Sequence, residues 1–460
     1  MDINILKKKL TNPDIKIREI NINNKIIYII FVETICNSNI INDFILKGII
    51  NKKVTSIKNI KNNIYDSQIK DILNEKDFFE SLYMGFTIIC IDNDFISFET
   101  KESLDSGIQV SQNEKSIKGP KDSFTENYQT NIGLIRKRIR SNYLIIKEFK
   151  IGNDSITNVS MIFMSNICNK NFAKKIEKKL SLINIDYVAN SNYISDILDK
   201  DNNIIPSTLS TERPDLASFS LMKGKIIIIV ENSPQVLILP TSFMDFIHTQ
   251  DDYYQNSKNV TLTRIIRLTA LGLSLIVPSL YLALTTFNQE TLPTGLLINF
   301  SIQREGVPFP SVVEALILWL IFEILKESDT RIPYVFGTSM SIVGALVLGD
   351  AAVNAGLISP IMIIIISISA ISTFLFSDND MVNSLRIWKL IFLLLSSIVG
   401  LYGIFIAFLL FIIKLCNTES YGFDYLNFEN YKDFFDSIIL TKKYKFNKRE
   451  SYLTTNIKRR

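Results

Sequence analysis

Histidine and closely spaced cysteines are scarce in this chain of 460 residues, and their scarcity excludes much metal and redox chemistry. With a single histidine, the chain cannot build a metal site from several histidines. The cysteines lie more than fifty residues from one another, which gives neither a zinc motif nor a disulfide framework. We therefore expect no metal site and no cofactor. The four cysteines are Cys36, Cys90, Cys168 and Cys416.

Acid/base catalysis depends on one candidate, His248. It lies three residues after Asp245 and four before Asp252, which on a helix is the ordinary spacing of surface side chains. We expect no enzyme activity. A net charge of +4 without a basic stripe also argues against nucleic-acid binding.

Charged residues are sparse in the second half of the chain. Between Arg264 and Lys414, 17 of 151 residues are Asp, Glu, Lys or Arg, about 11%, whereas the other 309 residues contain 79, about 26%. This segment contains apolar runs, and a run of about 20 residues crosses a hydrocarbon core of about 30 Å. The division excludes an ordinary soluble enzyme and predicts a soluble part followed by a membrane part.

Five apolar runs predict the membrane helices. The last run is longer than one perpendicular crossing requires, so it must tilt, kink near Gly400 and Gly403, or extend beyond the bilayer. The runs are about 22 residues from Arg264, then 310–325, 335–348, 357–376 and 385–415.

The basic residues that flank these runs predict the topology. Arg264 and Arg267 precede the first run and a basic tail follows the last, so the positive-inside rule places both ends in the cytoplasm. Both ends inside requires an even number of crossings. One run therefore re-enters or lies in the interface, or the stretch from Pro293 supplies a sixth element.

The first 260 residues alternate strand-like and helix-like segments. The pattern predicts a strand at 26–32, a helix over 58–84 and a hairpin around Asp92 to Asp94, and a polar link at 101–118 separates two lobes. No apolar core follows the first charges, so we expect no secretory signal and a cytoplasmic location.

The predicted fold class is a two-lobed α/β cytoplasmic domain followed by an all-α polytopic membrane bundle. We expect lobe 1 at residues 1–115, lobe 2 at 116–262, the bundle at 263–415 and a basic cytoplasmic tail at 416–460.

Acidic residues inside the apolar runs are the main candidates for a pore or gate, because charge at membrane depth usually faces protein or water. Glu314 and Glu323 are nine residues apart and so point to opposite sides of a straight helix. Each carboxylate lies near a membrane interface, or one of them lines a cation path. Of the two, Glu314 is the favoured candidate for a functional role. It either lines the cation path or locks a closed state by pairing with Arg304 or Arg331.

Small residues recur every four positions in a later run, which allows close helix packing or a gating interface between subunits. Asp350 and Asn354 follow on the same side and would form a polar ring at a pore mouth or a solvated turn. Pro308 and Pro310 prevent a regular helix, so the backbone that leads into the next apolar run is extended or broken. This segment is either a gate at membrane depth or a loop outside the membrane. The small residues are Gly337, Ser341, Ala345 and Gly349.

Several separated motifs occur in one order along the chain. The first contains Gly119, Pro120, Phe124, Thr125, Glu126, Asn131, Leu134, Ile135, Arg136 and Arg138. The second is Glu212, Arg213, Pro214 and Asp215 after Thr211, followed by ENSPQVLILPTSFMDFI and DDYY. The third is REGVPFPSVVEAL, which contains Pro308 and Pro310, followed by RIPYVFGTSMSIVGALVLGDAAVNAGLISP.

From residue 119 to about 426, these motifs resemble the A subunits of the GerA family of bacterial spore germinant receptors. The resemblance implies an oligomer around an ion-conducting pore for monovalent cations, in the inner membrane of the spore. It also implies two partners, a transporter-like B subunit that recognises the nutrient and a C-subunit lipoprotein. Asp350 departs from the family pattern, which has a neutral amide there.

A ligand-gated cation channel that triggers spore germination is thus the expected function. The alternative is a secondary transporter or a membrane subunit that binds the germinant directly. Against transport, the sequence has no pair of matching Gly- or Pro-broken runs in two halves.

Overall fold

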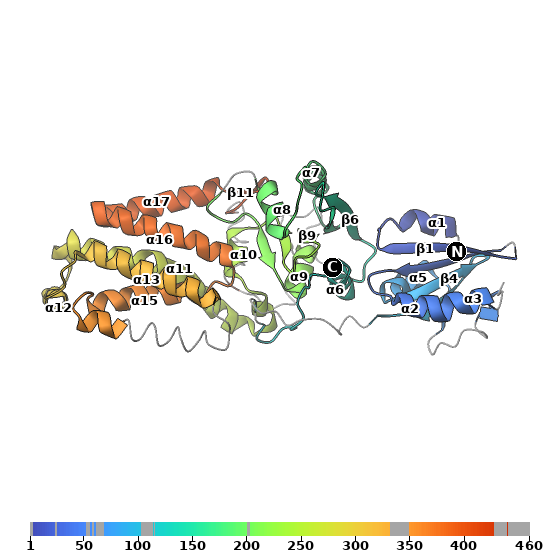
Figure 1. Cartoon of the computed structure of the whole chain (residues 1–460), viewed down its shortest axis with the longest axis horizontal. Helices are drawn as coiled ribbons and strands as arrows, with labels where there is room; N and C mark the ends of the chain where they lie inside the picture. The colour runs from blue at the N-terminus through green and yellow to red at the C-terminus, as the bar shows by residue number, and fades with distance from the viewer. Residues whose placement is uncertain are drawn as a thin grey trace. The chain divides into compact units, whose positions relative to one another are not determined.

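The computed structural model divides the chain into two compact units. Unit 1 comprises residues 1–202, 208–241 and 442–460, and unit 2 comprises residues 203–207 and 242–441 (Figure 1). The described residues are 3–23, 25–51, 56, 57, 59, 60, 69–102, 114, 116–199, 203–331, 349–426 and 439.

The first part of unit 1 is a five-stranded antiparallel sheet in the order β1-β2-β4-β5-β3. Its strands are β1 (Ile15–Ile22), β2 (Lys25–Val32), β3 (Lys70–Ile72), β4 (Phe86–Ile91) and β5 (Asp94–Glu99). Its helices are α1 (Ile3–Lys9), α2 (Ser38–Ile40), the π-helix η1 (Ile41–Leu46), α3 (Lys47–Asn51) and α5 (Glu75–Tyr83).

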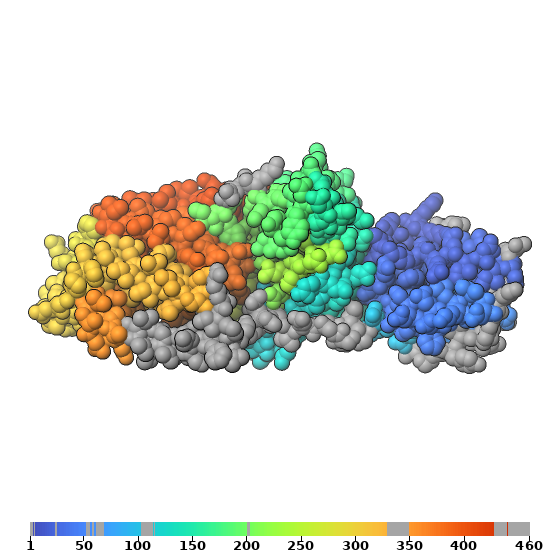
Figure 2. All heavy atoms as spheres, in the orientation of Figure 1, coloured from blue at the N-terminus to red at the C-terminus, as the bar shows by residue number. Residues whose placement is uncertain are grey.

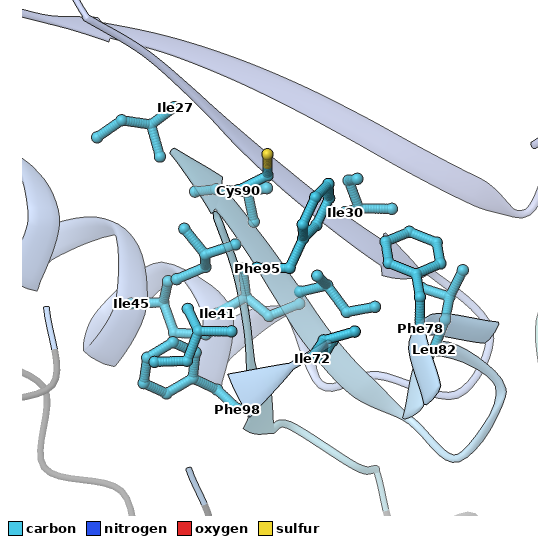
Figure 3. Close-up of a cluster of buried hydrophobic side chains, with 14 of the residues drawn as sticks. Ile27, Ile30, Ile41, Ile45, Ile72, Phe78, Leu82, Cys90, Phe95 and Phe98 are labelled. Carbon is cyan, nitrogen blue, oxygen red and sulfur yellow. The ribbon is translucent and has the colours of Figure 1, made fainter. Parts of the chain in front are cut away.

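Isoleucine and phenylalanine fill the core of this sheet. Ile41 and Ile45 of η1 and Phe78 and Leu82 of α5 are buried with strand residues such as Phe95 (Figure 3). Successive residues of a strand point to opposite faces of a sheet, and five of the six residues of β4 are buried. Both faces of β4 are therefore covered.

The structure confirms the predicted strand at 26–32 and the hairpin, and it corrects the helix predicted over 58–84. Asp92 and Asn93 have φ angles of 48° and 68°, the positive values that a two-residue turn between β4 and β5 requires. The helix prediction holds for α5 but is wrong at β3. There the residues pair with β5 as a strand, although their apolar positions have helical spacing. Residues 61–68 lie outside the described residues.

A second five-stranded antiparallel sheet follows in unit 1, in the order β6-β7-β9-β10-β8. All five residues of its central strand β9 are buried, as expected for a strand covered on both faces. The strands are β6 (Leu144–Ile151), β7 (Thr157–Met164), β8 (Leu209–Thr211), β9 (Ile226–Val230) and β10 (Val236–Leu239). The helices are α6 (Tyr128–Arg138), α7 (Lys170–Ser181), α8 (Ser191–Leu198) and α9 (Pro214–Lys223).

Asparagine begins several of the helices. In each case the Asn side chain accepts a hydrogen bond from a backbone N–H of the first turn, which contributes about 1 kcal/mol of helix stability. The Asn-rich composition therefore has a local structural role. The residues are Asn37, Asn127, Asn169, Asn190 and Asn256, which precede α2, α6, α7, α8 and α11.

Unit 2 is built mainly of apolar helices. Among the described residues, α11 and α16 are long and apolar enough to cross a membrane, and α15 and α17 are shorter apolar helices. Its helices are α10 (Phe243–Ile247), α11 (Ser257–Thr286), α12 (Thr294–Arg304), α13 (Ser311–Arg331), α15 (Pro360–Thr373), α16 (Asn379–Val399) and α17 (Leu401–Asn417). It also contains the 3-10 helices η2 (Gln250–Tyr254) and η3 (Gln289–Thr291) and the two-stranded ribbon of β11 (Glu419–Ser420) and β12 (Phe423–Asp424).

The long apolar run at 385–415 is divided between two helices, α16 and α17, that meet at Gly400. Gly400 has φ +67° and ψ −136°, a conformation that favours glycine. A Cβ added at Gly403 would lie 2.0 Å from the Leu395 carbonyl oxygen, so only glycine permits this close packing of α17 against the end of α16. Of the alternatives that we considered, the break near the glycines is the one observed.

Apolar side chains cover the outside of unit 2. Figure 2 shows α17, at the red end of the colour scale, on the surface of this unit. Tyr402 is 76% exposed and Phe405 61% exposed, as expected for side chains in contact with lipid.

The predicted fold class is confirmed. The chain has an N-terminal α/β part with two sheets, followed by a region of apolar helices. Both sheets are antiparallel, which the alternation of strands and helices did not reveal.

Candidate functional site in the membrane helices

A buried ion-pair cluster holds the first turns of α11. The Asp252 carboxylate, 2% exposed, accepts hydrogen bonds from Arg264 Nε at 3.0 Å and from Arg267 Nη1 at 3.0 Å. Arg264 and Arg267, which the sequence singled out for topology, therefore also have a structural role at Asp252. His248 and Asp252 do not lie on one helix, contrary to the spacing considered from the sequence, because α10 ends at Ile247 and His248 is its extended C-cap.

Glu314 is fully buried in the first turns of α13. Its Oε1 accepts hydrogen bonds from the backbone N–H of Ser359, at 2.5 Å, and from the Ser359 hydroxyl. Its Oε2 has no hydrogen-bond partner among the described residues. The carboxylate therefore ties α13 to the start of α15 through one oxygen only.

Two other buried polar atoms near Glu314 also lack partners among the described residues. They are the Ser311 hydroxyl and Arg304 Nε. Ser311 lies one turn before Glu314 on α13, and Tyr281 of α11 interacts electrostatically with both Arg304 and Glu314. Buried polar groups are normally hydrogen-bonded, so this polar cluster requires water, an ion or a second arrangement of its side chains.

The structure shows no direct ion pair between Glu314 and either predicted arginine among the described side chains. Arg304 ends α12 and lies within electrostatic reach of Tyr281. Arg331 ends α13, and its side chain lies outside the described part.

Glu323 lies on the opposite side of α13 from Glu314 and faces α16, whereas Glu314 faces the start of α15. Its Oε2 lies 2.7 Å from Arg386 Nε of α16. Lys389, one turn further along α16, donates from Nζ to the Ser369 carbonyl oxygen at 3.1 Å and to the Thr373 hydroxyl. We did not single out Arg386 and Lys389 from the sequence, although basic residues three apart on an apolar helix share one face.

The remaining membrane candidates fall partly within the described residues. Asp350 and Asn354 are exposed and lie one turn apart on a helix. A Cβ atom added at Gly349 would have no other atom within 4 Å. Pro308 and Pro310 are exposed in the irregular link between α12 and α13. Gly337, Ser341 and Ala345 lie outside the described residues.

Two arginines of the first motif, Arg136 and Arg138, form ion pairs within unit 1. Arg136, 0% exposed, donates to Asp14 from Nε at 2.9 Å and from Nη2 at 3.1 Å, and its guanidinium lies 4.9 Å from the centre of the Tyr83 ring. Asp14 lies in the turn immediately before β1 of the first sheet, and Arg136 lies in α6, before the second sheet. Arg138 donates to Asp122 at 2.6 Å with both side chains about one-fifth exposed.

Other motif residues shape loops in unit 1. The Asn131 amide donates to the Thr125 carbonyl oxygen at 2.6 Å, and its oxygen accepts from the Thr125 N–H at 2.8 Å. Arg213 donates to Asp215 at 2.8 Å at the start of α9, where Pro214 occupies the first turn. The Glu212 carbonyl oxygen accepts from the Phe124 N–H at 2.8 Å. Gly119, Pro120 and Glu126 lie in the exposed or half-exposed segment before α6.

The described residues contain no group of three or more His, Cys, Asp or Glu side chains that could hold a metal ion. Three cysteines are buried in unit 1, and burial raises the pKa of the Cys168 thiol to about 12. Such thiols are protonated at neutral pH and are poor nucleophiles.

A folded α/β part followed by apolar helices, two of them long enough to cross a membrane, is the arrangement of a membrane protein with a soluble N-terminal part. The chain belongs to the Bacillus/Clostridium GerA spore germination protein family, which it matches over residues 4–452. This membership confirms the resemblance of the motifs to the A subunits of germinant receptors. The family is one of receptors, and its A subunits function in receptors of several subunits.

Two relatives illustrate the range of similarity. The chain is 37% identical over 352 residues to spore germination protein KA of Bacillus subtilis, covering 76% of this chain and 65% of that protein. It is 34% identical over 434 residues to spore germination protein GerQA of Bacillus cereus, covering 92% of this chain and 85% of that protein. The chain thus spans a little under two thirds of the first relative.

One solved structure is also similar, the N-terminal domain of the A subunit of the Bacillus megaterium spore germinant receptor GerK3. The TM-score is 0.38 at 27% identity, with 52% of this chain and 93% of that chain covered.

Proposed function

We propose that this chain is the A subunit of a nutrient germinant receptor in the spore inner membrane, where copies of it surround a channel for monovalent cations. Binding of a nutrient to the receptor opens the channel and triggers germination. A transporter-like B subunit and a C-subunit lipoprotein are the proposed partners. Family membership supports the receptor role, and the polar cluster around Glu314 supports the channel.

The observation that carries the channel proposal is the half-satisfied Glu314 carboxylate. A buried carboxylate with one free oxygen is costly, and such groups inside membrane segments mark ion paths or locking contacts. In the proposed closed state the bonds from Ser359 hold α13 against the start of α15. When the helices separate, the carboxylate becomes available to water and cations.

Asp350 and Asn354 extend this proposal. They are exposed on the same side of a helix that precedes α15, so symmetric copies would present a ring of acidic and amide groups. Rings of acidic side chains favour cations. We do not assign Glu323 to the path, because Arg386 pairs with it and two lysines lie nearby.

The proposed topology places both ends of the chain in the cytoplasm. The break at Gly400 divides one apolar run into two, which with the run at 335–348 makes an even number of apolar segments. Arg264 and Arg267, which both bond to Asp252, lie in the first part of α11 and support a cytoplasmic start of this helix under the positive-inside rule. We retain the division into two cytoplasmic lobes at 1–115 and 116–262, a bundle at 263–415 and a cytoplasmic tail at 416–460.

Two substitutions distinguish the two proposed roles of Glu314, which are to attract cations in the open channel and to hold the closed state through Ser359. Glu314→Gln keeps an oxygen that accepts from Ser359 but removes the charge, so germinant-triggered release of monovalent cations from spores should slow about fivefold or more, the ratio for loss of roughly 1 kcal/mol of cation attraction. Ser359→Ala keeps the charge and removes one donor, so release without germinant should rise.

Glu305→Gln is the matched control, since Glu305 is exposed in the link before α13. It should leave release unchanged. The assignment of a path at Glu314 and Asp350 is wrong if Glu314→Gln and Asp350→Asn both assemble and release cations at the wild-type rate. We do not propose the transporter alternative, because no observation on the described residues favours it.

A further inference from the structure

A cavity between four helices of unit 2 carries an excess of positive charge. Side chains of α11, α13, α15 and α16 line it, and its volume is about 60 Å³. A buried water needs about 10–15 Å³ on this measure, so the cavity has room for about four water-sized groups. A tetrahedral oxyanion is of comparable size.

Three basic side chains and one acidic side chain line the cavity. Arg386 lies 2.7 Å from Glu323, which balances one positive charge. Lys389 donates to two neutral oxygens, those of Ser369 and Thr373. Lys326 makes no hydrogen bond or ion pair among the described residues. The lining therefore holds two positive charges more than negative charges.

Trp319 also lines the cavity and carries a hydrogen-bond donor. Its indole Nε1 is buried without a hydrogen-bond partner among the described residues. An unpaired ammonium and an unpaired indole N–H within membrane helices are both unfavourable. An anion with several acceptor oxygens in the cavity would pair with the Lys326 ammonium, as a phosphate group does.

We propose that this cavity binds the phosphate group of an anionic phospholipid head group. The cavity lies next to the outer surface of the bundle, since Phe374, in its lining, is 70% exposed. In a bilayer that side contacts lipid, so an acyl chain lies against Phe374 while the phosphate contacts Lys326 and Lys389. Basic pockets between membrane helices commonly bind lipid head groups in this way.

Tryptophan fluorescence gives a local measurement of this binding. The chain has two tryptophans, so Trp388→Phe leaves Trp319 in the cavity as the single fluorophore and keeps the aromatic contact with Phe411. The full chain in nanodiscs of phosphatidylcholine is titrated with brominated phosphatidylglycerol or brominated phosphatidylcholine. The proposal predicts that the anionic lipid quenches Trp319 at a lower mole fraction than the neutral lipid.

Charge substitutions test which side chains are responsible. Lys326→Gln should weaken the preference for phosphatidylglycerol about fivefold, the ratio that corresponds to one lost cation near a lipid phosphate. Lys258→Gln is the matched control, because Lys258 is exposed at the start of α11 and lies outside the cavity. It should leave the preference unchanged. Lys326 has no partner to lose, so its substitution should not unfold the protein.

Three outcomes overturn the proposal. They are equal quenching by both lipids, a preference that Lys326→Gln leaves intact, and inorganic phosphate that occupies the cavity in phosphatidylcholine while phosphatidylglycerol does not. The last outcome would assign the cavity to a free anion. Native mass spectrometry of the wild-type chain and Lys326→Gln counts bound phosphatidylglycerol without the tryptophan substitution, so the test remains decisive if Trp388→Phe does not fold.

Discussion

The buried pair of Arg136 and Asp14 makes a quantitative prediction about unit 1. Both side chains are 0–1% exposed, and they join α6 to the turn immediately before β1 of the first sheet. Arg136→Met leaves the Asp14 carboxylate buried and unpaired, and breaking a buried pair in this way costs about 3–5 kcal/mol. For a domain of 150–250 residues, 1 kcal/mol changes Tm by about 2–4 °C, so Tm should fall by about 6–20 °C.

Buried thiols provide the assay. Cys36, Cys90 and Cys168 are all buried in unit 1, whereas Cys416 is exposed in unit 2. In a Cys416→Ser background, a dye that becomes fluorescent on reaction with thiols reports the unfolding of unit 1 during heating. The full chain is measured in detergent, so that unit 1 unfolds in its natural connection.

Arg138→Met is the matched control in the same helix. Its partner Asp122 and Arg138 itself are about one-fifth exposed, and such pairs contribute about 1 kcal/mol or less. The double substitution Arg136→Met with Asp14→Leu should recover most of the lost stability, because no unpaired charge remains. Equal changes in Tm for Arg136→Met and Arg138→Met, or no recovery in the double variant, would refute this reasoning.

Three further predictions concern other parts of the chain. Gly403→Ala should destabilise the contact between α16 and α17, because its Cβ would lie 2.0 Å from the Leu395 carbonyl oxygen; Gly272→Ala, with no atom within 4 Å of the added Cβ, is the control and should retain full yield and thermal stability in detergent. Asp252→Ala should lower the free energy of unfolding by about 3–5 kcal/mol, because it removes the buried carboxylate that pairs with both Arg264 and Arg267, whereas Asp154→Ala, on an exposed turn of unit 1, should change it by less than about 0.5 kcal/mol. The pKa of Cys168, raised from 9.0 to about 12 by burial, means that the folded state keeps a proton that the unfolded state loses above pH 9; stability should therefore fall as pH rises from 9 towards 12, and Cys168→Ala should reduce that slope in unfolding measurements.

The sequence predicted the elements with strong local signals and missed those that depend on distant partners. The alternation and turn residues of 86–99 specify a hairpin by themselves, and the structure confirms it. The three residues of β3 carry no such signal, because they form a strand only through pairing with β5. Sheet order and antiparallel direction likewise depend on contacts between segments far apart in the chain.

In the candidate site, too, the sequence predicted what depends on local spacing and missed what depends on contacts between helices. The sequence identified Glu314 and Glu323 as charges at membrane depth and predicted that they face opposite sides of α13. It did not identify Ser359 as the partner of Glu314 or Arg386 as the partner of Glu323, because a serine or arginine pairs across helices only when packing brings it there. The role of Arg136 was also hidden, since Asp14 lies 122 residues away.

Reconstituted ion flux is the measurement that tests the proposed function most directly. The purified chain is placed in liposomes with and without its B subunit, and monovalent cation flux is recorded with and without germinant, together with the mass of the oligomer. The proposal predicts an oligomer whose cation flux requires germinant when the B subunit is present and is slower in Glu314→Gln than in Glu305→Gln. An oligomer that passes no cations under any of these conditions would contradict it.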